Sequence, residues 1–214
     1  MTGSIADIRQ DYILASLSEY DVEKDPITQF EKWWNEAVKS EINEVNAMTL
    51  STASADGIPS ARIMLLKGFD KDGFVFFTNY NSYKGRHLLE NPRACLVFFW
   101  KELERQVRIT GLVEKLPAES SDEYYYSRPV GSRLGAIASP QSTVIEDRAW
   151  LENRVKEVAE QYKDREPVRP DNWGGFIVKP ITVEFWQGRA SRLHDRIQYS
   201  LQDDAQWKIE RLAP

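Results

Sequence analysis

Two turn signals between apolar segments constrain the fold of this chain more than any other feature. Each signal is a short stretch that ends in Asp-Gly: Ser54-Ala55-Asp56-Gly57 and Asp70-Lys71-Asp72-Gly73. Such stretches join neighbouring antiparallel strands, because glycine adopts the left-handed backbone that tight turns need. The sequence therefore predicts hairpins that connect strands over residues 47–53, 59–69 and 74–78.

More strands follow, with a few helices between them. Asp25-Pro26 is a typical N-cap and first helical residue, and a helix with an apolar stripe follows it. A short helix is predicted from Ser82 to just before Asn91-Pro92, a third from Pro117 to near Ser127, and a longer one over 147–162. The remaining predicted strands are 93–100, 105–115, 175–178, 183–187, 197–201 and 207–211. This pattern predicts an α+β fold of the antiparallel barrel type, with residues 1–20 as a mobile N-terminal arm.

The composition excludes several classes of protein. A net charge of −5 argues against a general nucleic-acid binder, which carries a basic surface. No apolar run approaches the roughly 20 residues that a membrane-spanning helix needs. The start of the chain lacks the basic and apolar regions of a signal peptide, and a single cysteine cannot form an intramolecular disulfide. We therefore expect a soluble, cytoplasmic protein that binds neither nucleic acid nor membrane.

Common catalytic signatures are missing from the sequence. Two histidines and one cysteine leave no plausible zinc or iron cluster, so no metal site is predicted. The glycine-rich dinucleotide motif, the Walker A motif and the Gly-x-Ser-x-Gly motif are also absent. If the chain is an enzyme, an organic cofactor supplies its reactivity.

A row of cations near the C-terminus indicates an anion site. If the segment is extended, Arg192, His194 and Arg196 share one face at intervals of roughly 6–7 Å, with Trp186 close by. Like charges placed side by side repel one another unless an anion lies among them. A solvated strand face with ion pairs to neighbouring carboxylates accounts for the same row, and the segment alone does not separate the two interpretations.

Other cations and donors indicate further anion sites. Arg62 and Lys67 lie in one apolar strand, where regular geometry separates them by roughly 16–17 Å on opposite faces, so each needs its own anion. Snorkelling at strand ends is the alternative. The strand-to-helix junction at residues 77–86 offers free N–H groups and two cations, as an anion site or as an ordinary capped helix with a basic surface. Weaker donor groups lie at Gln106, at Tyr124 to Ser132 and at Gln141-Ser142. Together these sites suggest a phosphorylated cofactor and a phosphorylated substrate.

In their order along the chain, these motifs closely resemble the pyridoxine 5′-phosphate oxidase family. The resemblance runs from about Arg9 to Pro214 and is far more specific than one short motif. The matching segments are Arg62-x4-Lys67, Thr78-Asn79, Ser82-x-Lys84, Glu104-Arg105-Gln106-Val107, Ser127-Arg128-Pro129, Gln141-Ser142, Phe185-Trp186-Gln187-Gly188, Arg192-Leu193-His194-Asp195-Arg196 and the terminal Arg211-Leu212-Ala213-Pro214.

The resemblance implies a fold, a cofactor and a reaction. Residues 21–214 would form one FMN-binding split β-barrel, antiparallel and Greek-key-like, with surrounding helices. The active form would be a homodimer with FMN at the interface. The enzyme would oxidise pyridoxine 5′-phosphate or pyridoxamine 5′-phosphate to pyridoxal 5′-phosphate, with O2 reduced to H2O2.

The resemblance also implies the site residues. Arg192 and His194 would be catalytic, and Arg9 and Tyr12 would close the site as a lid. The cofactor would be bound by Arg62, Ile63, Lys67, Phe77, Thr78, Ser82, Tyr83, Lys84, Gln106, Gln141, Ser142, Trp186 and Arg196. The substrate would be bound by Arg9, Tyr12, Lys67, Tyr124, Arg128, Ser132, Arg192 and His194.

Two positions depart from the family pattern, and Phe77, where tyrosine is frequent, matters less if the contact there is through the main chain. Tyr83 stands where arginine is common, and we hypothesise that Arg86, three residues on and on the same helical face, replaces the lost cation. Two other functions compete with the oxidase. One is a non-catalytic carrier of flavin or pyridoxal phosphate, and the other is a flavin oxidase of the same barrel type that acts on a different ring. Keeping Arg192, His194, Arg128 and Ser132 argues against the carrier.

Overall fold

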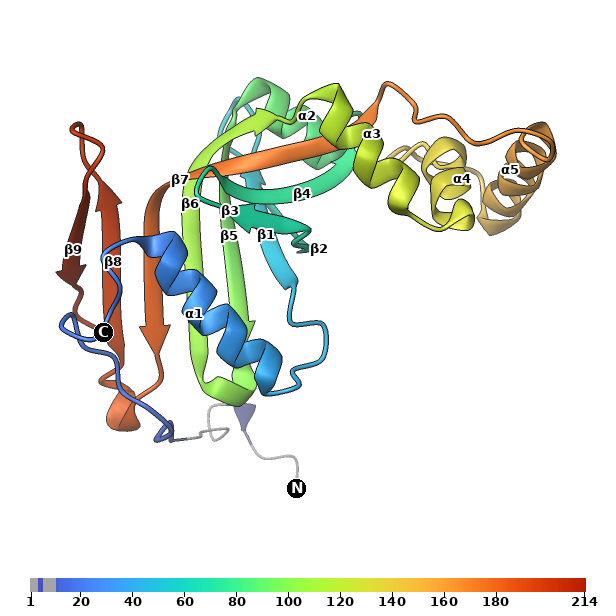
Figure 1. Ribbon diagram of the computed structural model, residues 1–214. Coiled ribbons are helices and arrows are strands. Elements are labelled where there is room, and N and C mark those ends of the chain that lie inside the picture. The colour runs from blue at the N-terminus through green and yellow to red at the C-terminus, as the bar shows by residue number, and fades with distance from the viewer. Residues whose placement is uncertain (1–3, 6–10) are drawn as a thin grey trace.

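The computed structural model describes residues 4–5 and 11–214, and its main element is a mixed-length antiparallel sheet of nine strands (Figure 1). Seven strands follow the order β2-β1-β5-β6-β7-β4-β3, and β8 and β9 continue from β7. The strands are β1 (Ala47–Ala53), β2 (Pro59–Leu65), β3 (Gly68–Asp70), β4 (Gly73–Asn79), β5 (Arg93–Trp100), β6 (Arg105–Lys115), β7 (Trp173–Gln187), β8 (Asp195–Leu201) and β9 (Trp207–Arg211). The predicted α+β class with an antiparallel sheet is confirmed.

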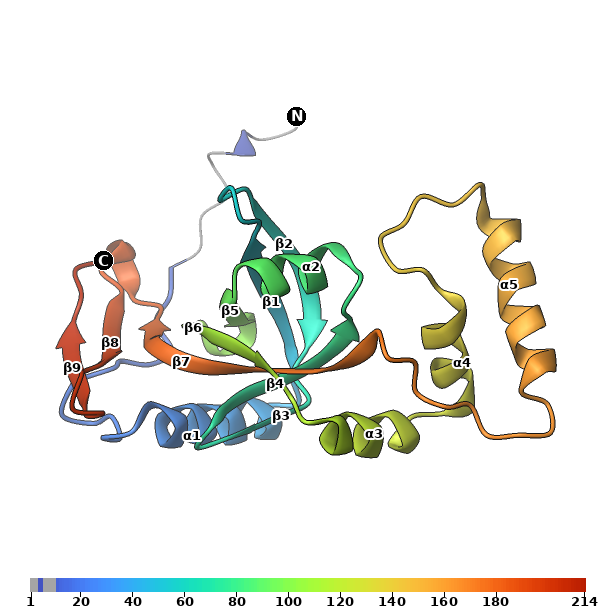
Figure 2. The ribbon, with the colours of Figure 1, turned by 90° about the horizontal axis from the view of Figure 1, so that it is seen from above.

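The sheet divides at strand β7, because one edge of this strand changes its partner strand. One edge of β7 pairs with β6 along its length, whereas the other edge pairs first with β4 and then with β8. The change falls near Pro180, where the register with β6 shifts next to Gly111. A Cβ on Gly111 would lie 2.1 Å from the Lys179 carbonyl oxygen, so only glycine permits this close approach. The sheet therefore curls into a half-barrel with β8 and β9 as a separate wing (Figures 1 and 2).

Helix α1 (Pro26–Lys39) covers one face of the sheet and closes the core. The Asp25 carboxylate caps it by accepting two main-chain N–H groups, as predicted. Its aromatic stripe faces inward: Phe30 packs 5.2 Å from Phe98, and Trp33 packs edge-on 5.2 Å from Phe185. All four rings are buried. The core is thus an aromatic layer between α1 and the sheet, which leaves the opposite sheet face outside it.

Three of the other four α-helices of the described chain lie toward the end of the molecule opposite β8 and β9, whereas α2 (Tyr83–Glu90) lies nearer the middle (Figure 2). Helix α2 follows β4, and α3 (Ala118–Ser127), α4 (Val130–Ala138) and α5 (Arg148–Gln161) project beyond the sheet. Two short 3₁₀ turns, η2 (Lys101–Leu103) and η3 (Ala190–Arg192), complete the elements. Helix α4 was not predicted from the sequence, because its two glycines lower its helix propensity.

Two strand predictions were wrong in their extent. The predicted strand 59–69 is broken at Leu66 and Lys67, because the Leu66 N–H bonds to Asn46 whereas the Lys67 N–H bonds to Val75 on β4. The chain changes partner strand there, so the spacing expected between Arg62 and Lys67 in a regular strand does not apply. Conversely, the two strands predicted at 175–178 and 183–187 are one strand, β7, which passes through Pro180.

In the described part of the chain, no helix has the length and apolar character needed to cross a membrane. Nor do three or more His, Cys, Asp or Glu side chains of residues 4–5 and 11–214 gather where they could hold a metal ion. The cytoplasmic location stays a prediction.

Candidate active site

A cavity of about 660 Å³ lies between β2, β4, α3 and α4, within the size range of small-molecule sites. Aromatic rings form one wall: Phe77 stacks on Tyr124 at 3.9 Å, and Trp173 stacks on Phe77 at 5.7 Å. Polar groups and cations form the rest. Eight of the predicted site residues line this cavity: Ile63, Lys67, Phe77, Thr78, Tyr124, Arg128, Ser132 and Gln141.

Arg128 carries an unsatisfied donor inside this cavity. Its guanidinium carbon lies 4.7 Å from the centre of the Trp173 ring, and its Nη1 is buried with no hydrogen-bond partner. A buried donor without an acceptor costs about 1–3 kcal/mol, and more when it is charged. Lys67 adds a second cation, with its ammonium 6.0 Å from the Tyr124 ring centre. Both side chains line the cavity, so an anionic ligand there would lie beside two cations.

A second pair of cations, Arg62 and Lys84, lies where β2 meets the start of α2. The Arg62 guanidinium donates to three neutral oxygens: Leu50 O at 3.1 Å, Thr52 Oγ1 at 2.8 Å and Ser60 Oγ at 2.5 Å. Lys84 is only 8% exposed. Among the described residues, neither cation forms an ion pair with a carboxylate.

The pKa values of both cations in this pair are lowered. Burial lowers the pKa of Lys84, and the positive charge of Arg62 lowers it further. Burial also lowers the pKa of Arg62. Two neighbouring cations whose charged forms are both disfavoured favour an anion between them.

The start of α2 positions Lys84. Ser82 Oγ accepts the Gly85 N–H at 3.2 Å and donates to the Asn79 carbonyl at 2.7 Å, which ties the helix to the end of β4. A Cβ on Gly85 would lie 2.2 Å from the Tyr80 carbonyl oxygen, so a larger residue would push the helix outward. The first turn of α2 therefore sits directly against β4.

Tyr83 and Arg86 lie on the outer side of the same helix. Tyr83 is 57% exposed, and the Arg86 guanidinium carbon lies 5.0 Å from the centre of its ring. Arg86 also donates to the Asn81 carbonyl at 2.8 Å. Its charge is therefore held by neutral groups and is available to an anion near the helix start.

Gln106, Trp186 and Arg196 form a row across β6, β7 and β8. They lie directly opposite one another in the strand register, so their side chains share a face. Their neighbours Val107 and Phe185 point to the core, so the row lies on the face away from α1. Arg196 is not a free cation: Glu184 accepts from it at 2.8 and 3.2 Å, and the Ala213 carbonyl at 2.7 Å. For Arg196, the ion-pair interpretation of the cation row is therefore correct.

The predicted extended row of Arg192, His194 and Arg196 was wrong. Residues 190–192 form the turn η3, and β8 begins only at Asp195. Ser191 and Arg192 both have positive φ angles, 56° and 61°, which are uncommon for residues other than glycine. The turn reverses the chain so that His194 Nδ1 accepts the Arg189 main-chain N–H at 3.1 Å.

His194 lies in an aromatic corner. Its ring is 4.6 Å from Trp186, and Tyr12 meets both rings edge-on at 5.9 and 5.7 Å. Burial lowers the pKa of His194, and the nearby Arg192 charge lowers it further. Since Nδ1 accepts a hydrogen bond, the neutral ring carries its proton on Nε2. We call Tyr12, Trp186, Arg192, His194 and Arg196 the C-terminal cluster; Arg9, predicted beside it, lies outside the described residues.

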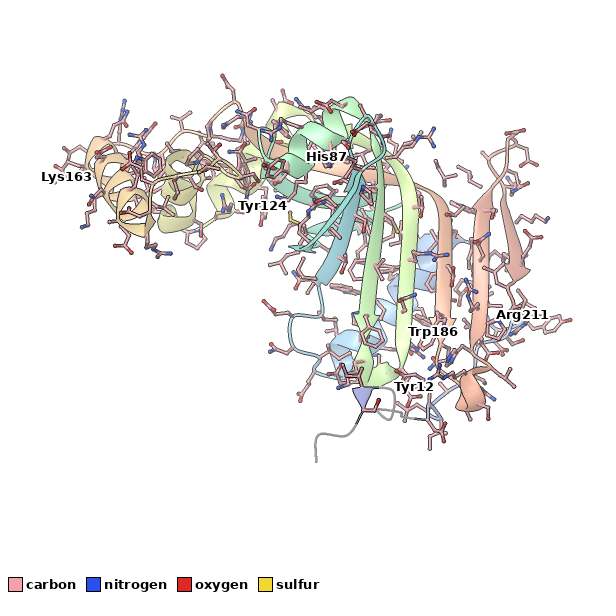
Figure 3. All side chains as sticks on the ribbon, turned by 180° about the vertical axis from the view of Figure 1, so that it is seen from behind. Tyr12, His87, Tyr124, Lys163, Trp186 and Arg211 are labelled. Carbon is pink, nitrogen blue, oxygen red and sulfur yellow. The ribbon has the colours of Figure 1, made fainter. Side chains whose placement is uncertain are left out.

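The predicted site residues of one chain form two separate groups. Figure 3 shows Tyr124 and His87 toward one end of the sheet and Tyr12 and Trp186 at the other. The cavity and the Arg62–Lys84 pair belong to the first group, and the C-terminal cluster to the second. Gln106 lies beside Trp186 in the second group, whereas Ser142 lies in an exposed turn with φ 70° after Gln141.

The comparisons with known proteins cover almost the whole chain. Residues 34–162 match the family model described as pyridoxamine 5′-phosphate oxidase. The chain belongs to the pyridoxamine 5′-phosphate oxidase family. Residues 173–214 match a second model, described as the pyridoxine 5′-phosphate oxidase C-terminal dimerisation region.

Full-length relatives support this assignment. The chain is 55% identical over 214 residues to the pyridoxine/pyridoxamine 5′-phosphate oxidase of Nostoc sp., with complete coverage of both chains. It is 58% identical over 213 residues to that of Burkholderia multivorans, with 99% of each chain covered. The crystal structure of PhzG from Burkholderia lata, in complex with tetrahydrophenazine-1-carboxylic acid, superposes with a TM-score of 0.86 at 31% identity, covering 94% of this chain and 98% of that one. The chain is thus an enzyme of this oxidase family with its split-barrel fold.

Sequence reasoning missed several residues around the oxidase-family site. Trp173 forms the back of the aromatic wall and supports Arg128, but a tryptophan at a strand start carries no distinguishing signal. Thr52 accepts from Arg62 and contacts His87 Nδ1 at 3.2 Å, a contact between segments 35 residues apart. Arg189, which holds His194, is adjacent to the recognised motif but outside it.

Proposed function

We propose that this chain catalyses the FMN-dependent oxidation of pyridoxine 5′-phosphate or pyridoxamine 5′-phosphate to pyridoxal 5′-phosphate, with O2 reduced to H2O2. The observation that carries the proposal is the buried, unpartnered Nη1 of Arg128 above an aromatic wall. A flat apolar surface beside a buried cationic donor suits an aromatic ring that bears a phosphate. The names of the full-length relatives support the same substrates.

The chemistry of the donor set fits FMN. Arg62 and Lys84 lack a carboxylate partner within the described part of the chain, and the N-terminus of α2 lies beside them, an arrangement that suits a phosphate group. When bound, FMN would supply a two-electron acceptor that passes its electrons to O2. The residues that would hold it are Arg62, Ile63, Lys67, Phe77, Thr78, Ser82, Tyr83, Lys84, Gln106, Gln141, Ser142, Trp186 and Arg196.

The remaining groups bind and orient the substrate. Lys67, Tyr124, Arg128 and Ser132 would hold its phosphate, and all four residues line the cavity. Arg192 would orient the pyridine ring through its fixed charge. His194, neutral because its pKa is lowered, would present the Nε2 proton as a hydrogen-bond donor. Residues 1–20, with Arg9 and Tyr12, would form the lid that limits access of water.

A second copy of the chain completes the proposed site. On the sheet face away from α1, Ile63 is 67% and Phe99 is 53% exposed, and Gln106 lies on the same face. Exposed apolar residues on one sheet face are typical of a protein interface. The match of residues 173–214 to a dimerisation region supports a homodimer. Its two-fold symmetry would bring the C-terminal cluster of one copy to the cavity of the other, with FMN between them.

Anaerobic addition of pyridoxine 5′-phosphate to the purified protein tests the function. We expect a yellow protein whose visible flavin absorption bleaches, and whose colour returns in air as pyridoxal 5′-phosphate forms. A yellow protein that does not bleach would instead indicate a flavin carrier or an oxidase for another ring. A protein that cannot be reconstituted with FMN would contradict the cofactor assignment.

A further inference from the structure

Residues 12–19 lie along the C-terminal part of the molecule, and we call this segment the strap. Side chains of the body hold it through its main chain. Glu104 Oε2 accepts the Leu14 N–H at 3.0 Å, and Asp195 Oδ2 accepts the Leu17 N–H at 3.0 Å. Arg211 donates to the Leu17 carbonyl at 2.9 Å. The strap is therefore attached at defined points. Each attachment is made by one side chain of the body and can be removed by a substitution with Ala or Met.

Arg189 is the attachment that also contacts His194. Its guanidinium Nη1 donates to the Ala15 carbonyl at 3.2 Å, and its Nε lies 3.8 Å from Asp195 Oδ2. Its main-chain N–H donates to His194 Nδ1 at 3.1 Å. The side chain therefore bonds to the strap while the main chain bonds to the imidazole.

The packing around Gly188 makes the position of the strap matter for Tyr12. A Cβ on Gly188 would lie 2.6 Å from Tyr12 Cγ, so the Tyr12 side chain lies directly on the backbone beside Arg189. Tyr12 stands three residues before Ala15 and contacts His194 and Trp186. A bond at Ala15 therefore limits how far Tyr12 can move from His194.

We propose that Arg189 is a positioning residue that holds the strap, and with it Tyr12, against His194. The inference rests on the proposed function, which assigns Tyr12 and His194 to the substrate. Replacing the side chain removes the bond to Ala15 but keeps the main-chain bond that sets the His194 tautomer. Substrate binding should weaken, therefore, while the chemistry of bound substrate is retained.

Steady-state kinetics of the FMN-loaded protein test whether Arg189 supports substrate binding. For Arg189→Met, we expect KM for pyridoxine 5′-phosphate to rise about three- to tenfold with kcat within about twofold, as for loss of one partly exposed charged hydrogen bond. Arg189→Lys keeps a cationic donor and should recover most of the wild-type KM. Arg148→Met is the matched control, because Arg148 pairs with Glu152 on α5, away from the strap.

Limited chymotrypsin digestion tests, without using activity, whether Arg189 holds the strap. We expect release of the 1–12 fragment, followed by mass spectrometry, to be several-fold faster in Arg189→Met than in wild type, and near wild type in Arg189→Lys and Arg148→Met. Unchanged cleavage and KM in Arg189→Met would overturn the proposal, as would a Lys variant no better than Met. If wild type does not oxidise the substrate, the proposed function fails, and the cleavage rates still decide whether Arg189 holds the strap.

Discussion

At His194, one main-chain N–H group and one nearby charge determine what the imidazole can do. The Arg189 N–H occupies Nδ1, and burial with the Arg192 charge disfavours the imidazolium. The positive φ angles of Ser191 and Arg192 are the local cost of this arrangement, since the turn they form delivers both groups to the ring. The backbone conformation of this loop thus sets the tautomer of His194 and contributes to its lowered pKa.

The titration of His194 should show this directly. We expect an NMR midpoint below 6.5, the ordinary value for histidine. Arg192→Gln should raise the midpoint only part of the way, because burial is the larger cause and the Arg192 charge the smaller. A His87→Gln background leaves one imidazole to follow, since the chain has two histidines. A midpoint at or above 6.5 in the wild-type loop would contradict the prediction.

The same shift affects stability. The folded pKa lies below the unfolded one, so the unfolded chain binds the proton more readily. The contribution of His194 to stability is therefore fully present above about pH 6.5 and decreases as the pH falls through the folded pKa.

At Tyr83, the question is whether Arg86 supplies the missing cation. The Arg86 guanidinium is held by the Tyr83 ring and the Asn81 carbonyl, with no carboxylate to neutralise it among the described residues. If it binds the FMN phosphate, Arg86→Ala should weaken FMN affinity about tenfold, as for one charged hydrogen bond, with Lys84→Ala weakening it at least as much. Titration of the apoprotein by flavin fluorescence measures both. Loss in Lys84→Ala alone would show that Arg86 does not compensate.

Individual contacts were the least predictable level of the site. The motif residues were found because their order along the chain is specific, but the partners that hold them come from distant segments. Thr52 reaches Arg62 across a strand pair, and Trp173 reaches Arg128 from the start of another strand. No local pattern marks such residues, since threonine and tryptophan are common in strands for packing alone.

Among the elements, predictions succeeded where one face of a strand or helix packs on the core. Strand β6 alternates buried and exposed residues, and α1 carries its aromatic stripe at helical spacing. They failed where the environment changes along an element. The two strands expected at 175–178 and 183–187 are one strand, β7, which continues through Pro180 and changes partner strand there.

The contact of α2 with β4 should depend on Gly85. Because its Cβ would meet the Tyr80 carbonyl, Gly85→Ala should destabilise the fold by about 1–3 kcal/mol, as in other overpacked sites. The outward shift of α2 should also weaken FMN binding, since Lys84 moves with the helix. Urea unfolding and flavin titration measure the two effects.

Gly131 provides the matched control for that substitution. It also lies in a helix, α4, but has open space where its Cβ would be. Gly131→Ala should leave FMN affinity unchanged and leave stability equal or raise it by up to about 1 kcal/mol. Equal destabilisation of the two variants would mean that helix propensity, and not the contact with Tyr80, governs Gly85.

For the whole molecule, the separation of the two groups of site residues leads to a complementation test. Arg128 belongs to the cavity and Arg192 to the C-terminal cluster, at opposite ends of the sheet. If each site uses one group from each copy, a hybrid of Arg128→Ala and Arg192→Ala chains contains one intact site. Refolding an equal mixture should then recover roughly a quarter of wild-type activity, since half the dimers are hybrids with one good site of two. Each variant alone is the control, and no recovery in the mixture would mean that both groups act within one chain.

Strand β7 has a further consequence, because it carries Trp173 near one end and Trp186 near the other. The 13 steps between them give a contour length of about 43 Å at the rise of a β-strand. One uninterrupted strand therefore fixes the spacing along the chain between the cavity and the C-terminal cluster within each copy. Removing a single residue from it would shorten that length by about 3.3 Å and turn Trp186 toward α1. The length of β7 thus sets how the cavity of one copy and the C-terminal cluster of the other can meet in a dimer.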